Sequence, residues 1–255
     1  MSGDPFDLTG RVALVTGANK GIGAGIALAL AAAGADVMGV SRSIADDGGS
    51  SGAAVRALGR SFFALRTDIS EPDGVAALVE RVEALSRPVD ILINNAGLAQ
   101  RAPAEHHTDA QWAEVIAVNL TAPFILAREF GSRMLRRGAG KIVFLASMTT
   151  YQGGRDVVGY TASKSGVAGI VHALANEWAG RGVNVNAIAP GYIETDLTAG
   201  SHQDPVLRRA FQDRIPAGRW GSPADLGGAA VFLSSAASDY VNGVVLPVDG
   251  GWLVR

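Results

Sequence analysis

The sequence predicts an α/β fold in which a doubly wound parallel sheet of about seven strands carries helices on both faces. Short runs of β-branched and apolar residues alternate along the chain with longer stretches of helical periodicity. Strands that are apolar almost throughout are typical of parallel sheets that are covered on both sides. The 255 residues suffice for one domain with a large core, and no linker is long enough to divide them.

Each predicted strand is an apolar-rich run of six or seven residues that ends in small or polar residues. In chain order the strands are RVALVTG, ADVMGVS, FFALRTD, VDILINN, KIVFLAS, VNVNAIA and VVLPVD. Helical periodicity predicts helices over Ile22–Ala33, Pro72–Ser86, Asp109–Arg136, Tyr160–Gly180 and Pro223–Ser234. The glycine- and serine-rich stretch IADDGGSSGAA, residues 44–54, predicts a loop that enters a short helix.

Composition narrows the function classes. A formal net charge of −2 provides no electrostatic footprint for nucleic acid or for an anionic membrane, so we expect a small-molecule partner. Zero cysteines exclude disulfides, thiolate metal sites and cysteine nucleophiles. The four histidines form no pair at helical i, i+4 spacing, so we predict no metal site.

The N-terminal region also bears on location. The start, MSGDPFDLTG, is polar and acidic where a signal peptide needs a basic flank and an apolar run. The apolar stretch Ile26–Ala35 is far shorter than the roughly 18 to 20 residues of a membrane-spanning helix. We therefore expect a cytoplasmic protein with no membrane segment, in keeping with the lack of cysteine.

A glycine-rich loop follows the first predicted strand and leads directly into a helix. Its glycines are Gly17, Gly21 and Gly23 in VTGANKGIG. Glycines let the backbone approach a pyrophosphate, and a helix N-terminus offers free N–H groups and partial positive charge. The strand–loop–helix context predicts a Rossmann-type dinucleotide site. A tight turn without a ligand stays open as an alternative, because the spacing differs from the commoner G-x-G-x-x-G.

The end of the second predicted strand bears on which dinucleotide binds. Sites for NAD often place an acidic residue there, close to the ribose 2′-hydroxyl. This chain has Ser41 and Arg42 instead, and Lys20 stands inside the glycine loop. Two cations can converge on a 2′-phosphate, which favours NADP(H) over NAD(H). The alternative is that both side chains extend into solvent.

Tyr160 and Lys164 in GYTASKSG carry the predicted chemistry. Residues at i and i+4 share one helix face, and a cation beside a phenol favours the phenolate, so Tyr160 can act as a general acid and base. Ser147, at the end of the fifth strand, can hold the same substrate oxygen. The alternative for the pair is an exposed helix face on which Tyr160 and Lys164 have no function. The alternative for Ser147 is a hydrolase nucleophile, which is disfavoured because the G-x-S-x-G motif is missing.

These motifs resemble the short-chain dehydrogenase/reductase family, over essentially the whole chain. The glycine loop TGANKGIG, the NNAG quartet at 94–97, Asn119, Ser147 and the Tyr160–Lys164 pair follow one another in that family's order. The resemblance implies that Tyr160 is the proton donor and acceptor beside a nicotinamide. It also implies that Asn119 connects Lys164 to solvent through water, so the expected catalytic residues are Asn119, Ser147, Tyr160 and Lys164.

The resemblance extends to the other cofactor contacts. It implies that the neighbourhood of Asp68 contacts the adenine and that the APGYIET segment binds the nicotinamide carboxamide. A helix-cap role for Asp68 and a plain strand-exit turn stay open as alternatives. The expected cofactor contacts are Gly17, Asn19, Lys20, Gly21, Ile22, Gly23, Ser41, Arg42, Asp68, Ile69, Asn95, Ala96, Gly97, Tyr160, Lys164, Pro190, Gly191, Ile193 and Thr195.

Substrate selection is expected from strand-end residues and from residues 196–216, a stretch of mixed polarity that reads as a lid. The candidate substrate contacts are Arg101, Met148, Gln152 and Tyr192. The phrases KIVFLASMTTYQGG and ANEWAG resemble the sugar-acid branch of the family, which implies that the enzyme interconverts a secondary alcohol and a ketone of a sugar acid or polyol. That branch is generally NAD-linked, whereas Lys20 and Arg42 favour NADP(H). A ketoacyl–carrier-protein reductase and a non-catalytic dinucleotide-binding subunit are the alternatives.

The C-terminal VVLPVDGGWLVR has almost no polar tail. We predict that Trp252 is exposed on the single chain and is buried against another subunit. The family resemblance implies a homotetramer.

Overall fold

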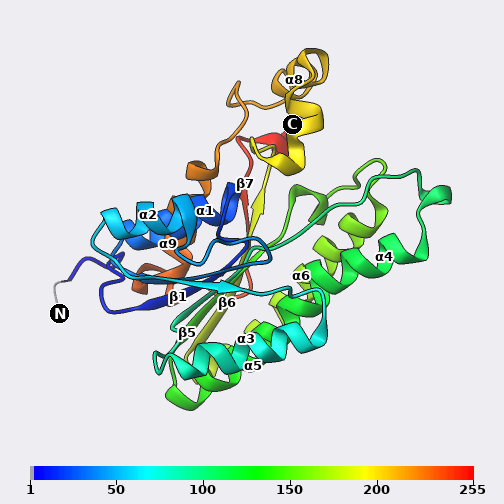
Figure 1. The fold of residues 1–255 in the computed structure, drawn as a ribbon. Coiled ribbons are helices and arrows are strands. Elements are labelled where there is room, and N and C mark those ends of the chain that lie inside the picture. The colour runs from blue at the N-terminus through cyan, green and yellow to red at the C-terminus, as the bar shows by residue number, and fades with distance from the viewer. Residues whose placement is uncertain (1–2) are drawn as a thin grey trace.

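One seven-stranded parallel sheet forms the centre of the computed structural model, which describes residues 3–255 (Figure 1). Its strand order is β3-β2-β1-β4-β5-β6-β7, and neighbouring strands pair in parallel throughout. This confirms the predicted doubly wound sheet. The strands are β1 (Val12–Thr16), β2 (Asp36–Ser41), β3 (Phe62–Arg66), β4 (Ile91–Asn94), β5 (Gly140–Leu145), β6 (Val183–Pro190) and β7 (Val245–Val248).

Helices cover both faces of the sheet. Figure 1 shows α1, α2 and α9 together on one side and α3 to α6 on the other, with α8 at the far end beside the C-terminus. The helices are α1 (Gly21–Ala32), α2 (Gly49–Ala57), α3 (Pro72–Ala84), α4 (Asp109–Ile116), α5 (Ala122–Arg137), α6 (Val158–Trp178), α7 (Ala199–His202), α8 (Pro205–Gln212) and α9 (Gly227–Ser234).

The apolar strands are explained by a core on each face. Successive strand residues point to opposite faces, so a strand that is covered on both sides must be apolar throughout. In β4, Leu92 belongs to the core formed with α3, α5 and α6, whereas its neighbours Ile91 and Ile93 belong to the core formed with α1 and α9. All three side chains are at most 1% exposed.

The direction of strand order reverses between β1 and β4, and ligands of doubly wound sheets bind at this point. Thr16 fixes the two strand ends here. Its hydroxyl oxygen accepts hydrogen bonds from the backbone N–H groups of Asn95 at 3.0 Å and Ala96 at 2.9 Å. The Asn95 side chain in turn donates to the Thr16 carbonyl at 2.7 Å. These bonds hold the glycine loop beside the loop that follows β4.

The helix predicted over Asp109–Arg136 is interrupted. A π-helical turn at Ala117–Thr121 separates α4 from α5. Within the described residues, 109–137 is the one helical stretch whose length and composition would allow it to cross a membrane. Its apolar side chains include Leu126, Phe130 and Met134, which are packed in the core against the sheet. Core packing therefore accounts for these three apolar side chains.

Trp252 contradicts the prediction of an exposed C-terminal aromatic residue. It is 2% exposed and packs within its own chain against Met148, Ile215 and Trp220. The last residues fold back in a short 3₁₀ turn, Trp252–Val254, which begins at Gly251 with φ +89°. This turn places the indole inside the molecule, so its burial needs no second subunit.

Candidate active site

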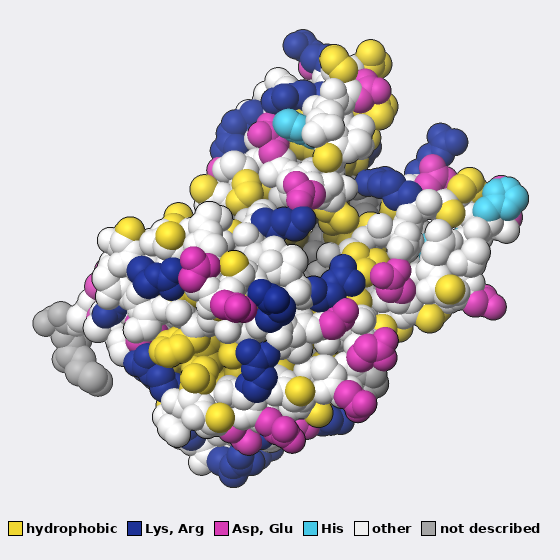
Figure 2. All heavy atoms as spheres, in the orientation of Figure 1, with side chains coloured by type: hydrophobic (Ala, Val, Ile, Leu, Met, Phe, Trp, Pro, Cys, Tyr) yellow, Lys and Arg dark blue, Asp and Glu magenta, His cyan; other side chains and the backbone are white. Residues whose placement is uncertain are grey.

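A cavity of about 1100 Å³ opens at the carboxyl ends of the strands. The loops that follow β1, β2, β4, β5 and β6 all contribute to its lining, together with the segment 196–201. Figure 2 shows the corresponding hollow below the part of the surface that carries α8. The cavity therefore lies where the order of the strands predicts a ligand.

The glycine loop lines one end of this cavity and fits a dinucleotide pyrophosphate. Gly17 and Gly21 have φ of +70° and +56°, in the left-handed region that glycine tolerates. A Cβ added to Gly23 would lie 2.2 Å from the carbonyl oxygen of Gly17. The N-cap residue Lys20 makes no side-chain hydrogen bond to the first turn of α1. The first N–H groups of α1 are thus left for an anion.

Lys20 and Arg42 both line the cavity, as the NADP(H) prediction requires, but each is next to a carboxylate. The Lys20 ammonium lies 2.6 Å from Asp196, and the Arg42 guanidinium lies 3.8 Å from Asp68. Neither carboxylate lies next to its cation in the sequence. A 2′-phosphate would have to compete with these partners for the two cations.

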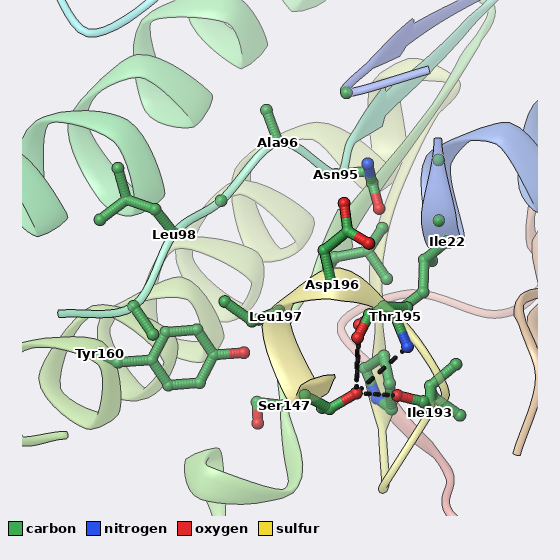
Figure 3. A pocket seen from close by; sticks show the side chains of 18 of the residues that line it. Ile22, Asn95, Ala96, Leu98, Ser147, Tyr160, Ile193, Thr195, Asp196 and Leu197 are labelled. Carbon is green, nitrogen blue, oxygen red and sulfur yellow. Dashed lines mark hydrogen bonds between the residues drawn. The ribbon is translucent and has the colours of Figure 1, made fainter. Parts of the chain in front are cut away.

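Ser147, Tyr160 and Lys164 meet at the other end of the cavity. Figure 3 shows the hydroxyl of Tyr160 directed into the pocket, with Asn95 and Ile22 on the opposite side. The Lys164 ammonium lies 5.6 Å from the centroid of the Tyr160 ring, so the pair shares one helix face as predicted. Lys164 is 4% exposed, and its Nζ donates to the Leu145 carbonyl at 2.6 Å.

The electrostatics of this pair differ from the sequence prediction. Burial raises the pKa of Tyr160, and the Ser147 hydroxyl and the positive charge of Arg101 offset that rise in part. Burial also lowers the pKa of Lys164, to about 8. The net direction for the phenol is therefore upward, whereas the prediction had Lys164 lowering it. For the phenol, desolvation is the largest effect and outweighs the contributions of Ser147 and Arg101.

Asn119 does not line the cavity but supports its wall. It is 1% exposed, and its Oδ1 accepts from the Leu98 N–H at 2.9 Å. Its Nδ2 donates to the Leu98 carbonyl at 2.8 Å and to the Ser163 hydroxyl at 3.2 Å. A Cβ added to Gly97 would lie 3.3 Å from Asn119 Oδ1 and 3.7 Å from Lys164 Nζ. The π turn thus brings Asn119 close to Lys164 and to the loop after β4.

The remaining predicted cofactor contacts all lie on the cavity wall, from Asn19 to Thr195. Among the predicted substrate contacts, Arg101, Met148 and Tyr192 also line it. Gln152 does not line the cavity, so the structure does not bring it together with the other three. The chain turns at Met148–Thr150, and the Gln152 N–H bonds back to the Met148 carbonyl at 3.2 Å. After this turn, Gln152 lies outside the residues that line the cavity.

An aromatic cluster behind Tyr192 was not predicted. The Tyr192 ring stacks on Phe211 with centroids 4.4 Å apart, and it meets Trp252 and Trp220 at 4.7 Å and 5.1 Å. Tyr192 and Phe211 line the cavity. Arg155 also lines it and was also missed. The cluster joins three distant segments of the chain, so no local sequence pattern reveals it.

The fold and this cavity define a dinucleotide-binding oxidoreductase. A family model described as enoyl-(acyl carrier protein) reductase matches residues 17–253, and the chain belongs to the short-chain dehydrogenase/reductase family. It is 54% identical over 252 residues to a 2-dehydro-3-deoxy-D-gluconate 5-dehydrogenase of Pseudoalteromonas atlantica. That alignment covers 99% of each chain. Galactitol 2-dehydrogenase of Cereibacter sphaeroides is 42% identical over 252 residues, covering 98% of this chain and 97% of the relative.

Solved structures agree with this family. A protein from Beutenbergia cavernae that is described as an NAD(P)-dependent gluconate 5-dehydrogenase, with bound NADP, has a TM-score of 0.94 at 49% identity. The match covers 99% of this chain and 100% of that one. A gluconate 5-dehydrogenase from Burkholderia cenocepacia, in complex with NADP and tartrate, has a TM-score of 0.93 at 36% identity, covering 99% and 98%.

Proposed function

We propose that this protein interconverts the secondary alcohol and the ketone of a sugar acid, with NADP(H) as the hydride carrier. The observation that carries the proposal is the meeting of Ser147, Tyr160 and Lys164 in one cavity with an uncapped helix N-terminus. The substrate class is supported by the relatives named 2-dehydro-3-deoxy-D-gluconate 5-dehydrogenase and by the relative solved with NADP and tartrate.

Each residue has a separate task in this reaction. The bound nicotinamide supplies or accepts the hydride at the substrate carbon. In reduction, the Tyr160 hydroxyl donates its proton to the carbonyl oxygen as negative charge grows there; in oxidation, the phenolate takes that proton back. Ser147 donates a hydrogen bond to the same oxygen. Lys164, with a pKa of about 8, exchanges the proton onward, and Asn119 holds the neighbouring wall and connects Lys164 to water.

The preference for NADP(H) rests on Lys20 and Arg42. Both cations line the cavity, and their carboxylate partners are exposed enough for a phosphate to displace them. The dinucleotide is proposed to contact the nineteen residues named in the sequence analysis, with the pyrophosphate at Gly21 to Gly23 and the carboxamide at Pro190 to Thr195. Supporting this choice, several relatives have been solved with NADP.

Residues 196–216 are proposed to act as the substrate lid. They contain the short helices α7 and α8, and residues 196–198, Ser201 and Phe211 line the cavity. Arg101, Met148 and Tyr192, which line the same cavity, are the proposed substrate contacts. A cytoplasmic location is proposed from the polar start of the chain and the lack of cysteine, and a homotetramer is proposed from the family resemblance. Size-exclusion chromatography with light scattering tests the assembly.

The decisive experiment is a spectrophotometric assay of NADP(H) and NAD(H) turnover. The panel contains 2-dehydro-3-deoxy-D-gluconate, D-gluconate, galactitol and acetoacetyl thioesters. Turnover of a sugar acid supports the proposal, and turnover of the thioesters alone would make the protein a ketoacyl reductase. Tyr160→Phe is expected to lower kcat at least about 100-fold while NADPH still binds, because only the proton donor is removed. Full activity in this variant would refute the role of Tyr160.

A further inference from the structure

Two arginines border the cavity at the end that holds Tyr160. Arg101 follows β4 and Arg155 follows β5, and both line the cavity. The Ala102 N–H donates to the Asp156 carbonyl at 3.0 Å, so the two loops lie side by side next to these arginines. Figure 2 shows dark blue side chains gathered around the rim of the hollow.

The backbone between the loops is held in an uncommon conformation. Asp156 has φ +60°, a left-handed value that costs a non-glycine residue about 1 kcal/mol. Its carbonyl is the acceptor of the bond from Ala102. The strained residue therefore makes the contact that keeps Arg155 close to the loop of Arg101. Strain of this kind is often retained where it shapes a binding site.

The charge balance at this end favours an anion. Within residues 3–255, Arg101 has no ion-pair or hydrogen-bond partner for its guanidinium, and Arg155 has only the weak contact to its neighbour Asp156, at 3.8 Å. The positive charge of Arg101 is felt by Tyr160 and by Tyr192. In contrast, the carboxylates that line the cavity each face a cation: Asp68 faces Arg42, Asp196 faces Lys20 and Glu194 faces Arg208.

We propose that Arg101 and Arg155 together bind the carboxylate of the substrate and make the enzyme select a sugar acid over the corresponding neutral polyol. The planar guanidinium group matches a carboxylate in charge and in hydrogen-bond geometry. This specificity assignment rests on the proposed function, because it assumes that the substrate enters the end of the cavity that holds Tyr160.

Arg155 provides the cleaner test of the two. The charge of Arg101 also acts on the Tyr160 phenol, so its removal changes proton transfer as well as binding. Arg155 is not among the groups that shift the pKa of Tyr160. Its side chain is 94% exposed, so Arg155→Gln is expected to leave the folded structure unchanged.

The experiment measures binding of D-gluconate and D-glucitol to the NADP-loaded protein by calorimetry, and kcat/KM for the same pair. It compares the wild type with Arg155→Gln, Arg155→Lys and the control Arg181→Gln. Arg181 is also exposed and carries the same charge, but it precedes β6 and so lies at the amino ends of the strands, whereas the cavity lies at their carboxyl ends. For Arg155→Gln we expect D-gluconate affinity to fall about 3- to 10-fold, with D-glucitol unchanged. Arg155→Lys keeps the positive charge, so it should retain part of the preference for D-gluconate over D-glucitol.

The outcomes separate this proposal from the proposed function. If the wild type binds D-gluconate no better than D-glucitol, the arginine assignment is overturned. It is also overturned if Arg155→Gln keeps its affinity for both compounds, or loses affinity for both to the same extent. A wild type that binds D-gluconate in an Arg155-dependent way supports the assignment even if no sugar acid is turned over. Absence of turnover on every sugar acid counts against the proposed function alone.

Discussion

Lys20 and Asp196 form an ion pair, 2.6 Å long, that joins the glycine loop to the first residue of the segment 196–216. The partners are 176 positions apart in the sequence. Their side chains are 67% and 78% exposed, so the pair contributes at most about 1 kcal/mol and is screened by salt. A doubly charged phosphate can therefore displace Asp196 from Lys20.

The first prediction concerns cofactor preference. Asp196→Asn frees Lys20, so we expect NADPH to bind about 2- to 5-fold more tightly, with little change for NADH. Lys20→Gln should instead weaken NADPH binding about tenfold and spare NADH. Fluorescence titration with both nucleotides checks these opposite signs. If the two variants change NADPH and NADH affinity in parallel, Lys20 does not read the 2′-phosphate.

The second prediction concerns pH. The positive charge of Arg101 lowers the pKa of Tyr160, so Arg101→Gln must raise that pKa further. The phenolate that oxidation needs then forms only at higher pH, and the acidic limb of the kcat/KM profile for alcohol oxidation is expected to move to higher pH. Arg101→Lys, which keeps the charge, should leave the limb near its wild-type position. Identical profiles in the Gln variant and the wild type would contradict the electrostatic contact.

The third prediction tests the glycine loop. In Gly23→Ala, the added Cβ would lie 2.2 Å from the Gly17 carbonyl oxygen, so the loop must shift. We expect a loss of NADPH affinity of more than tenfold and destabilisation of about 1–3 kcal/mol. Gly169→Ala is the matched control, because a Cβ there has no neighbour within 4 Å. In the interior of α6 this control should stabilise the protein by about 0.5–1 kcal/mol and leave NADPH binding intact.

The fourth prediction concerns the aromatic cluster. Trp252→Ala removes the edge contact to Tyr192 and the ring beneath Arg214, whose guanidinium carbon is 4.0 Å from the ring centroid. We expect the free energy of unfolding in urea to fall by about 3–5 kcal/mol and KM for the substrate to rise. Val254→Ala, which shortens an 88% exposed neighbour, should change the stability by less than about 0.5 kcal/mol.

The strands and the glycine loop could be predicted because their patterns are local. An apolar run such as VALVT is buried on both faces, and the glycines have φ values or close contacts that other residues tolerate poorly. The Tyr160–Lys164 pair was likewise set by helical spacing. The direction of the Tyr160 pKa shift could not be predicted in this way, because desolvation depends on how the folded chain packs around the phenol.

Features that depend on distant contacts were missed. The ion pair of Lys20 and the cluster of Tyr192 join segments that no periodicity connects. Trp252 is buried by segments that lie far from it in the sequence, and Gln152 lies off the cavity wall after a turn at Met148 that no local pattern predicts. The π turn at 117–121 was hidden because AVNLT continues an apolar helical pattern.

That π turn has a consequence for how the chain tolerates changes in length. A π turn contains one residue more than the α-helical turn it replaces. Deleting a single residue within Ala117–Thr121 would let α4 and α5 merge into one regular helix whose two halves face nearly as before. The deletion would remove the local bulge, however, and withdraw Asn119 from Leu98 and Ser163. The position of Asn119 behind the cavity wall thus depends on the number of residues in this turn as well as on their identity.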